Sequence, residues 1–365
     1  MHVPDGFINA PVSAVTGVVA AAAVAVSLRG ARRELGGTSH APGAGGERTA
    51  PLAGLVAAFI FAVQMLNFPV AAGTSGHLLG GALAAILVGP YTGMLCVSVV
   101  LLMQGVLFAD GGLTALGVNI TDMAITTTVV AYLLFRGLLA VLPRTRRSVT
   151  AASFVAALFS VPAAALVFTA IYALGGTTDV PITKVLTAMV GVHLLIGIGE
   201  AAITALTVGA VLAVRPDLVY GARGLTVPLK LRVGGELIDA PAAVPAPAAA
   251  RAGSTRKVWG IGIVTALLLA GFVSFYASAS PDGLEKVAHD KGIDAKTTEH
   301  ATSDSPLADY SVKDIGDARL AGGLAGVIGV GVTVVVGSGV FWAVRRRRTD
   351  SAPRGRGTDR TPEAV

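Results

Sequence analysis

The sequence predicts an all-α, polytopic membrane protein, with a seven-helix domain followed by a two-helix module that has a polar extracytoplasmic loop. Of the 365 residues, 53% are hydrophobic and only 14% are charged, whereas soluble domains carry about 25% charged residues. Apolar segments recur along the chain, and most are long enough to cross the ~30 Å hydrocarbon core of a bilayer. The single cysteine, Cys96, lies inside one of these segments, which excludes an intramolecular disulfide framework.

Nine apolar segments account for the expected helices. The first is expected to stay in the protein as a membrane helix, because the first basic side chain after His2 is Arg29, beyond the apolar run, and a secretory signal needs a basic start. The third is short and rich in glycine, so we expect a partial or tilted span. The segments cover residues 10–28, 51–68, 77–89, 91–109, 118–142, 150–174, 184–213, 258–279 and 320–344.

Composition divides the chain into four parts. Residues 1–215 hold the first seven segments and form one membrane domain. Residues 216–255 include "DAPAAVPAPAAARAG", which is too poor in large apolar residues to pack and indicates a cytoplasmic linker. Residues 256–348 hold the last two segments around a polar loop, and residues 349–365 are predicted to be a disordered cytoplasmic tail.

The positions of Lys and Arg predict the orientation. With the amino terminus outside, 22 of the 28 Lys and Arg residues fall on the cytoplasmic side, as the positive-inside rule expects. The carboxy terminus is then cytoplasmic, and "RRRR" at 345–348 favours a membrane anchor over a nucleic-acid site. The outer loop carries nine acidic and five basic residues, and it is either merely solvated or a funnel that concentrates cations.

The opening residues, "MHVPDGF", offer several nitrogen donors close together. A free α-amino group has a pKa of about 7.7–8.0, so losing its proton near neutral pH costs little. His2 adds its backbone amide and its imidazole, which close adjacent chelate rings around one ion. Planar nitrogen donors suit Ni(II) or Cu(II). Because His2 is large, we expect Met1 to be retained during processing.

His77 is the candidate for a fourth donor. It stands at the start of an apolar segment, on the outer side of the membrane in the predicted topology. The glycines around it allow another backbone to approach closely, and an intramembrane ionisable residue is a functional candidate by default. A structural hydrogen-bonding role is the alternative.

Four stretches resemble the signature runs of the cobalt/nickel M components of energy-coupling-factor (ECF) transporters, the CbiM/NikM family. They are "MHVPDGF", "AVQMLNFPVAAGTSGHLLGG", "LLFADGGLTALGVN" and "HLLIGIGE". The resemblance covers residues 1 to about 215 and implies a prokaryotic plasma-membrane component that captures Co²⁺ or Ni²⁺ for an ABC importer, with no permanent cofactor. It further implies partners, a coupling membrane protein and two ATPases, and metal ligands at Met1, His2 and His77.

The second module resembles a PDGLE domain, the CbiN/NikN-like N component that accompanies M components. The run Pro281 to Glu285 carries this resemblance. It implies that the module helps the first domain to load metal. His289 and His300, in the same loop, are expected to be solvated surface residues rather than transient metal ligands.

Other polar residues lie in or beside the apolar segments. Gln64, Asn67, Gln104 and Asn119 are expected to orient the metal ligands through hydrogen bonds, with interhelical hydrogen bonding as the alternative. His193 and Glu200 are two helical turns apart and share a face. We expect a structural or coupling role for this pair, with the carboxyl group neutral or paired, since a charge at this depth is costly.

The absence of a phosphate-binding loop of the Walker type means that partner subunits must hydrolyse ATP. Two rival functions are consistent with parts of the sequence. "GTSG" at 73–76 fits a rhomboid-like intramembrane serine protease that uses Ser75 with His193 as base. A passive divalent-cation channel is the other, although the polar residues cluster towards the outer half instead of forming a through-going row.

Overall fold

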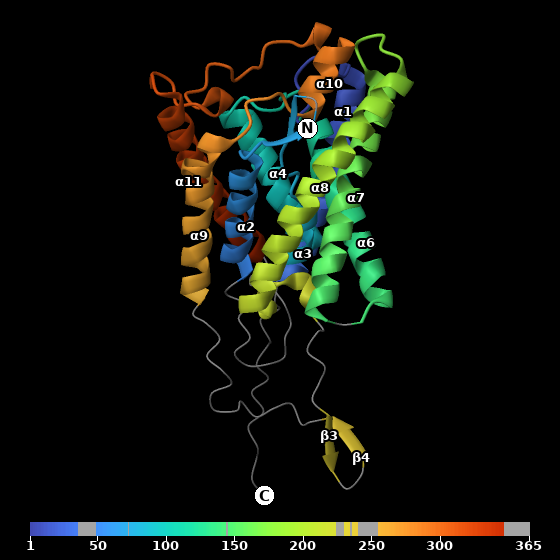
Figure 1. Cartoon of the computed structure of the whole chain (residues 1–365), viewed down its shortest axis with the longest axis vertical. Helices are drawn as coiled ribbons and strands as arrows, with labels where there is room; N and C mark the ends of the chain where they lie inside the picture. Colours follow the sequence, from blue (N-terminus) through green and yellow to red (C-terminus); the bar gives the residue numbers. More distant parts are fainter. Residues whose placement is uncertain are drawn as a thin grey trace, which may run out of the picture.

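The protein, described here by a computed structural model, is a bundle of long helices that run roughly along the longest axis of the molecule (Figure 1). Within its described residues, seven helical spans are long and apolar enough to cross a membrane. The predicted all-α, polytopic fold is therefore confirmed. The described residues are 1–35, 49–71, 73–143, 145–223, 230–233, 236–239 and 255–346.

Helices follow the predicted apolar segments of the first domain. The fifth segment runs without a break from Leu116 to Val141, although its centre is a π-helix, η1. Gly89 interrupts the chain and Pro90 begins the next helix, since proline suits the first helical turn. The elements are α1 (Ala10–Leu35), α2 (Thr49–Gln64), α3 (Gly81–Val88), α4 (Pro90–Leu107), α5 (Leu116–Asn119), η1 (Ile120–Thr126), α6 (Thr127–Val141), α7 (Arg146–Gly175) and α8 (Ile182–Val214).

The third apolar segment is the short α3, as its glycine content suggests. All eight of its residues are buried, among α2, α4, α6, α7 and α8. A helix of this length spans about 12 Å, less than half of the hydrocarbon core. The chain just before α3 therefore lies within the bundle and not above it.

A short antiparallel hairpin precedes α3 and was not expected from the apolar pattern. It pairs β1 (Phe68–Ala71) with β2 (Thr74–Gly76), and Gly73 turns the chain with a φ of +73°. Glycine adopts this left-handed conformation without steric cost. Because β2 ends at Gly76, His77 comes directly after the hairpin and leads into α3.

The second module packs against one edge of the first domain, on α2 (Figure 1). Small residues permit close contacts between α2 and α11 (Ala318–Arg346): a Cβ added to Gly54 would lie 2.9 Å from the Ser338 backbone nitrogen. The two modules thus share one bundle. The elements are α9 (Thr255–Gly271), η4 (Val273–Tyr276), α10 (Gly283–Lys291), η5 (Ile293–Lys296), η6 (Ala308–Tyr310) and α11 (Ala318–Arg346).

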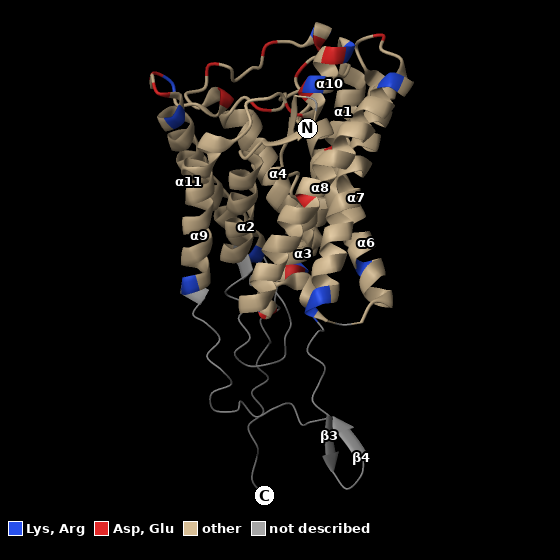
Figure 2. Ribbon diagram, viewed as in Figure 1, with Lys and Arg blue, Asp and Glu red and all other residues tan. Residues whose placement is uncertain are grey.

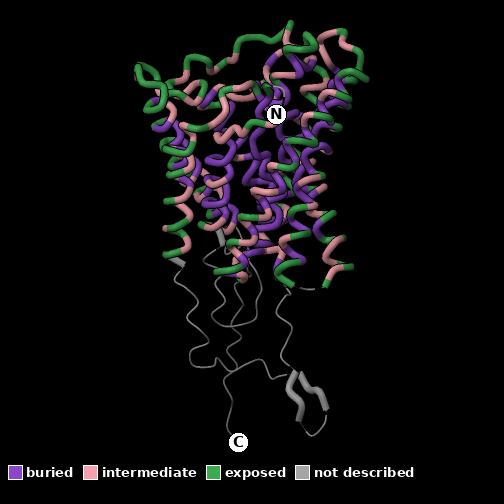
Figure 3. Tube along the Cα trace, in the orientation of Figure 1, coloured by how far each residue is buried: buried purple, intermediate pink, exposed green. Residues whose placement is uncertain are grey.

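The two ends of the bundle differ. One end, called the amino-terminal end here, carries Met1, the β1–β2 hairpin and α10 (Figure 1). Acidic residues recur along the long connecting loop at this end (Figure 2). Figure 3 shows buried residues through the middle of the bundle and exposed ones on the outward helix faces. Large apolar side chains lie on these outward faces, for example Val18 and Leu133, as expected of helices that face lipid.

The predicted linker contains a second hairpin, of β3 (Lys230–Val233) and β4 (Glu236–Asp239). η2 (Pro216–Leu218) and η3 (Tyr220–Ala222) come directly after α8. The remainder of the predicted linker up to residue 254, and the predicted disordered tail at 349–365, lie outside the described residues.

Candidate metal centre

The amino-terminal segment folds into the bundle. Met1, Val3 and Phe7 are each no more than 3% exposed. The Val3 amide donates to Asn119 Oδ1 (2.7 Å), and Asn119 Nδ2 donates back to the Val3 carbonyl (3.1 Å). The Gly112 amide also donates to the Val3 carbonyl (2.8 Å). One side-chain amide and one backbone amide therefore hold this strand in a fixed register.

Asp5 and Gly6 turn the segment toward α1. Asp5 Oδ1 accepts from the Thr114 amide (2.8 Å) and from the Thr114 hydroxyl. Gly6 has a φ of +89° and an added Cβ would lie 2.3 Å from the Lys296 carbonyl oxygen. The Thr298 amide donates to the Asp5 carbonyl (3.1 Å). The second module thus closes over this turn, at a place where only glycine fits.

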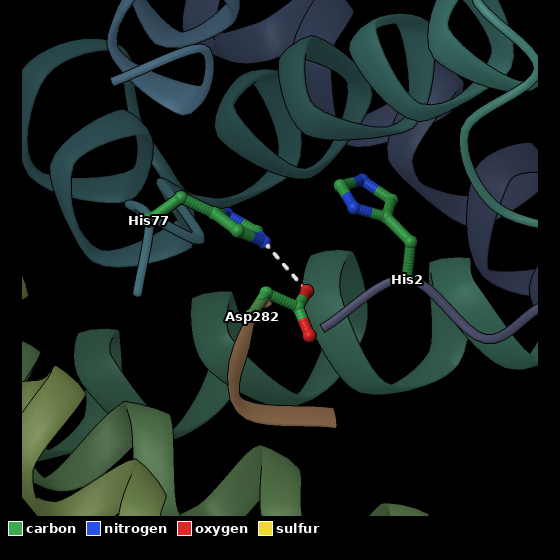
Figure 4. A group of neighbouring side chains, drawn as sticks. All are labelled: His2, His77 and Asp282. Carbon is green, nitrogen blue, oxygen red and sulfur yellow. Dashed lines mark ion pairs between the residues drawn. The ribbon is translucent and has the colours of Figure 1, made fainter. Parts of the chain in front are cut away.

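Figure 4 shows His2, His77 and Asp282, from three separate segments of the chain, gathered at one place. The Met1 nitrogen lies 2.7 Å from His77 Nε2 and 2.7 Å from Asp282 Oδ2. His77 Nε2 lies 3.5 Å from the same Asp282 oxygen. The rings of His2 and His77 stack with centroids 5.2 Å apart. One ligand atom from each of His2, His77 and Asp282 lies within 4.8 Å of the other two, which is the scale of a single-ion site.

The His2 ring lies between two oxygen atoms. Its Nδ1 is 3.2 Å from Asp110 Oδ1 and its Nε2 is 3.1 Å from Gln104 Oε1. Burial lowers the pKa of the His2 imidazole to about 4, although Asp110 opposes this shift. The ring is therefore neutral near pH 7. A neutral ring has one N–H, so its other nitrogen keeps a lone pair that can bind a metal.

A side chain of the second module supports Asp110. The Tyr310 hydroxyl donates to Asp110 Oδ2 (2.6 Å), and the Tyr310 ring stacks on Phe108 with centroids 4.9 Å apart. Burial, with the adjacent Asp110 charge, raises the pKa of the Tyr310 hydroxyl well above its ordinary value. Tyr310 is therefore a permanent hydrogen-bond donor to the carboxylate that faces His2.

The His77 ring is oriented by its own backbone. Nδ1 donates to the Leu78 carbonyl (3.0 Å), which leaves Nε2 unprotonated in the neutral ring and directed at Met1. The turn that follows is held from two helices. Gln64 Nε2 donates to the Leu79 carbonyl (3.0 Å), and Glu200 accepts from the amides of Leu79 (2.5 Å) and Gly80 (3.0 Å).

The structure brings most of the predicted residues to one place. Met1, His2 and His77 meet at the centre, Gln104 and Asn119 contact the amino-terminal segment, and Gln64 contacts the turn after His77. Asn67 participates through its backbone, because its carbonyl accepts from the Ser278 amide (2.7 Å). Asn67 therefore joins the second module to the hairpin.

His193 and Glu200 do not pair with each other. His193 Nδ1 donates to the Met189 carbonyl on its own helix (2.7 Å), and Glu200 binds the turn after His77. Ser75 does not contact His193 either: its hydroxyl donates to the Ser280 carbonyl (2.8 Å). The arrangement that a serine protease would need is thus not formed.

The two loop histidines differ in position. The His289 side chain is 83% exposed and contacts Asp294, as expected of a solvated residue. His300 is half-buried: its Nε2 contacts the Gly111 carbonyl (3.2 Å), beside Asp110, and its Nδ1 accepts from the Thr302 amide (3.1 Å). His300 therefore packs on the first domain and is less solvated than expected.

Sequence reasoning missed Asp282 as a neighbour of the site. Asp282 caps α10 in a reciprocal capping box with Glu285, a pattern that the spacing Asp-x-x-Glu can reveal. Burial alone would raise the pKa of the Asp282 carboxyl, but the charged amino terminus, together with the adjacent His77, holds that pKa well below its usual range. Asp282 is therefore an anion. Its proximity to Met1 had no local signal in the sequence.

Comparison with known proteins yields two family matches. The family model described as "Cobalt uptake substrate-specific transmembrane region" matches residues 2–218, and that of the PDGLE domain matches residues 256–346. A protein of Haloquadratum walsbyi named "Putative metal transport protein" is 38% identical over 220 residues, 60% of this chain and 94% of the relative.

The names of two further relatives include a metal. A fused nickel transport protein NikMN of Rhodobacter capsulatus is 39% identical over 131 residues, 36% of this chain and 35% of the relative. A cobalt transport protein CbiM of Geobacter sulfurreducens is 34% identical over 174 residues, 46% of this chain and 49% of the relative.

Proposed function

The chain belongs to the family of the cobalt uptake substrate-specific transmembrane region, and from that premise we propose that it captures Co²⁺ or Ni²⁺ for an ATP-driven importer. The ion is a substrate and not a resident cofactor. It exchanges water for nitrogen donors at the amino-terminal end of the bundle, and no covalent chemistry on the protein is required.

The proposed ligands are the Met1 amine, the His2 amide and imidazole, and His77 Nε2. The observation that carries this assignment is the distance of 2.7 Å between the Met1 nitrogen and His77 Nε2 inside a buried site. Residues 76 positions apart are brought together there, and each presents a nitrogen that can lose or lacks a proton. A planar set of nitrogens suits Ni(II), and the names of relatives support both metals.

The proposed orientation places the amino-terminal end outside the cell and the carboxy terminus in the cytoplasm of a prokaryote. Residues 1–215 then form the metal-binding domain, residues 216–255 a cytoplasmic linker and residues 256–348 the PDGLE module. A coupling membrane protein and two ATPase subunits are the proposed partners. ATP hydrolysis by these partners reorients the metal-loaded domain and releases the ion inside.

Protons should compete with the metal ion for the amine and imidazole nitrogens. Amine and imidazole donors bind a metal only after they have lost their protons, so affinity should weaken as pH falls. His2 is not expected to set this dependence above about pH 4, because burial lowers its pKa to about 4.

Metal uptake by intact cells tests the proposal. Cells that produce the chain with its ATPase and coupling partners should accumulate radioactive Co²⁺ or Ni²⁺, and His2→Ala should abolish this accumulation. His289→Ala is the matched control, because it removes an imidazole whose side chain is 83% exposed. Accumulation that survives His2→Ala would contradict the ligand assignment, and accumulation that continues without any ATPase would favour a passive channel.

A further inference from the structure

The start of α10 is fixed against the hairpin that precedes His77. The Ser75 amide donates to the Pro281 carbonyl (2.9 Å), and the Ser75 hydroxyl donates to the carbonyls of Ser280 (2.8 Å) and Pro281 (3.2 Å). These bonds join residues that are about two hundred positions apart in the sequence. Ser75 lies two residues before His77, and Ser280 and Pro281 directly precede Asp282.

Gly283 lets α10 approach α8 closely. A Cβ added at this position would lie 2.8 Å from Ile196, 2.9 Å from Val192 and 3.2 Å from the His193 ring. The helix start is therefore seated on α8 as well as on the hairpin. The position of the Asp282 backbone is determined from both sides.

The two oxygens of Asp282 have separate roles. Oδ1 accepts from the Glu285 amide (2.8 Å), while the Glu285 carboxylate accepts from the Asp282 amide (2.8 Å). This capping box fixes the rotation of the carboxylate. It leaves Oδ2 directed at the Met1 nitrogen and His77 Nε2.

The distances around Oδ2 match those between neighbouring ligands of one ion. Donors at right angles around an ion with bonds of about 2.1 Å lie about 3 Å apart. The Met1 nitrogen, His77 Nε2 and Asp282 Oδ2 are separated by 2.7, 2.7 and 3.5 Å. Without an ion, a protonated Met1 amine can donate to both His77 Nε2 and Asp282 Oδ2. An ion that displaces protons from the amine would meet the same three donor atoms.

We propose that Asp282 Oδ2 is itself a ligand of the transported ion, so that the second module supplies one oxygen donor to the nitrogen site of the first domain. This inference rests on the proposed function and extends it. The ion then has a carboxylate oxygen beside its nitrogens, which neutralises one of its charges inside a buried site. A fused module that provides a ligand completes the site, in addition to holding the amino-terminal segment in place.

Replacing Asp282 by Asn or Ser tests the proposal, because both residues cap helices as well as Asp does. Asp282→Asn removes the negative charge. Asp282→Ser removes the charge and also shortens the side chain, so that no side-chain oxygen can reach the ion. The matched control is Asp290→Asn, which removes an exposed carboxylate from the same helix, where it pairs with Lys286. The probe is Ni²⁺ added to the purified full-length chain, with a native amino terminus and a carboxy-terminal tag.

The readout is the Ni K-edge X-ray absorption spectrum together with the dissociation constant. A four-coordinate planar site gives a characteristic edge feature, which an additional oxygen ligand suppresses. The parent and Asp290→Asn should lack this feature and Asp282→Ser should show it. Both Asp282 variants should bind Ni²⁺ at least about 10-fold more weakly. Losing even a residue that only hydrogen-bonds to a metal ligand costs roughly 10- to 100-fold in affinity.

The outcomes separate this inference from the proposed function. A parent that binds Ni²⁺ with the same edge spectrum as Asp282→Ser would overturn the oxygen ligand and leave the nitrogen site standing, whatever the change in affinity. A parent that binds neither Ni²⁺ nor Co²⁺ would overturn both.

Discussion

The two sides of the candidate metal centre are built differently. His77 follows a hairpin and is held by a turn whose backbone groups bond to Gln64 and Glu200, which lie in the buried interior of α2 and α8. Met1 and His2 lie on an extended strand without a regular element of its own. Loop residues and short helix ends hold that strand, among them Asn119 and Asp110.

Because of this difference, we expect substitutions on the two sides to affect folding free energy and metal affinity to different degrees. The His77 side is part of the packed bundle, so changes there should cost folding free energy as well as metal affinity. The amino-terminal side is also buried, but hydrogen bonds from loops and helix ends hold it, so it can open locally without unfolding the bundle. Changes there should therefore cost mainly metal affinity. The strand of Met1 and His2 is thus the side that can admit the ion, and His77 is the fixed side.

The largest expected effect is that of His77→Ala. It removes a proposed ligand and leaves the Met1 amine facing a cavity. Affinity for Ni²⁺ or Co²⁺ should therefore fall by more than the roughly 100-fold that losing a residue hydrogen-bonded to a metal ligand can cost. Isothermal titration of the purified chain measures this loss. An unchanged dissociation constant would mean that His77 is not a metal ligand. The comparison between the two sides of the site would then no longer hold.

Glu200→Gln should show that the fixed side belongs to the bundle. The amide side chain has a single acceptor oxygen, so one of the two buried backbone amides, of Leu79 or Gly80, loses its partner. Such a loss costs about 1–3 kcal/mol, which should lower the midpoint of thermal unfolding in detergent even without metal. A wild-type midpoint with reduced metal affinity would mean that the two sides do not differ in this way.

Asn119→Ala should have the opposite signature. It removes both hydrogen bonds to Val3, so metal affinity should fall roughly 10- to 100-fold. The unfolding midpoint of the metal-free protein should stay near that of the parent, because the amino-terminal segment can open locally and expose the Val3 amide to water. Combining it with Glu200→Gln sharpens the comparison, because effects on independent sites add. Strong non-additivity in affinity would show that the two sides act as one unit.

Tyr310→Phe should give the smallest effect. It removes only the hydroxyl that donates to Asp110, a bond of about 1 kcal/mol, which is about a 5-fold change in affinity. Tyr276→Phe is the control, since Tyr276 is 74% exposed. Equal affinities for the two variants would mean that the second module does not act on His2 through Asp110.

Hydropathy predicts the helices well because each apolar run must form its backbone hydrogen bonds internally within lipid. Even the short α3 follows from the glycines around Gly80 and Gly81. The β1–β2 hairpin was missed because it lies between two apolar runs and is fixed by contacts with Ser280 and Pro281, which are distant in sequence.

The site was harder to predict where its contacts involve the backbone. Glu200 was expected to be neutral or paired, and it shares a helix face with His193. Its partners are instead amides of a turn that no side-chain pattern reveals. Asp282 is recognisable as a helix cap from sequence, yet its second oxygen finds Met1 only because Ser75 and Gly283 fix α10 against the first domain.

The central claim, that the amino-terminal nitrogen itself binds the ion, is tested most directly by the metal content of two forms of the chain. One form begins at Met1, and the other carries a single additional glycine before it, which moves the free amine by about 3.8 Å. After loading with Ni²⁺ or Co²⁺ and gel filtration, mass spectrometry of the eluted protein should find one ion per chain in the first form and almost none in the second. Equal metal content in both forms would contradict the account.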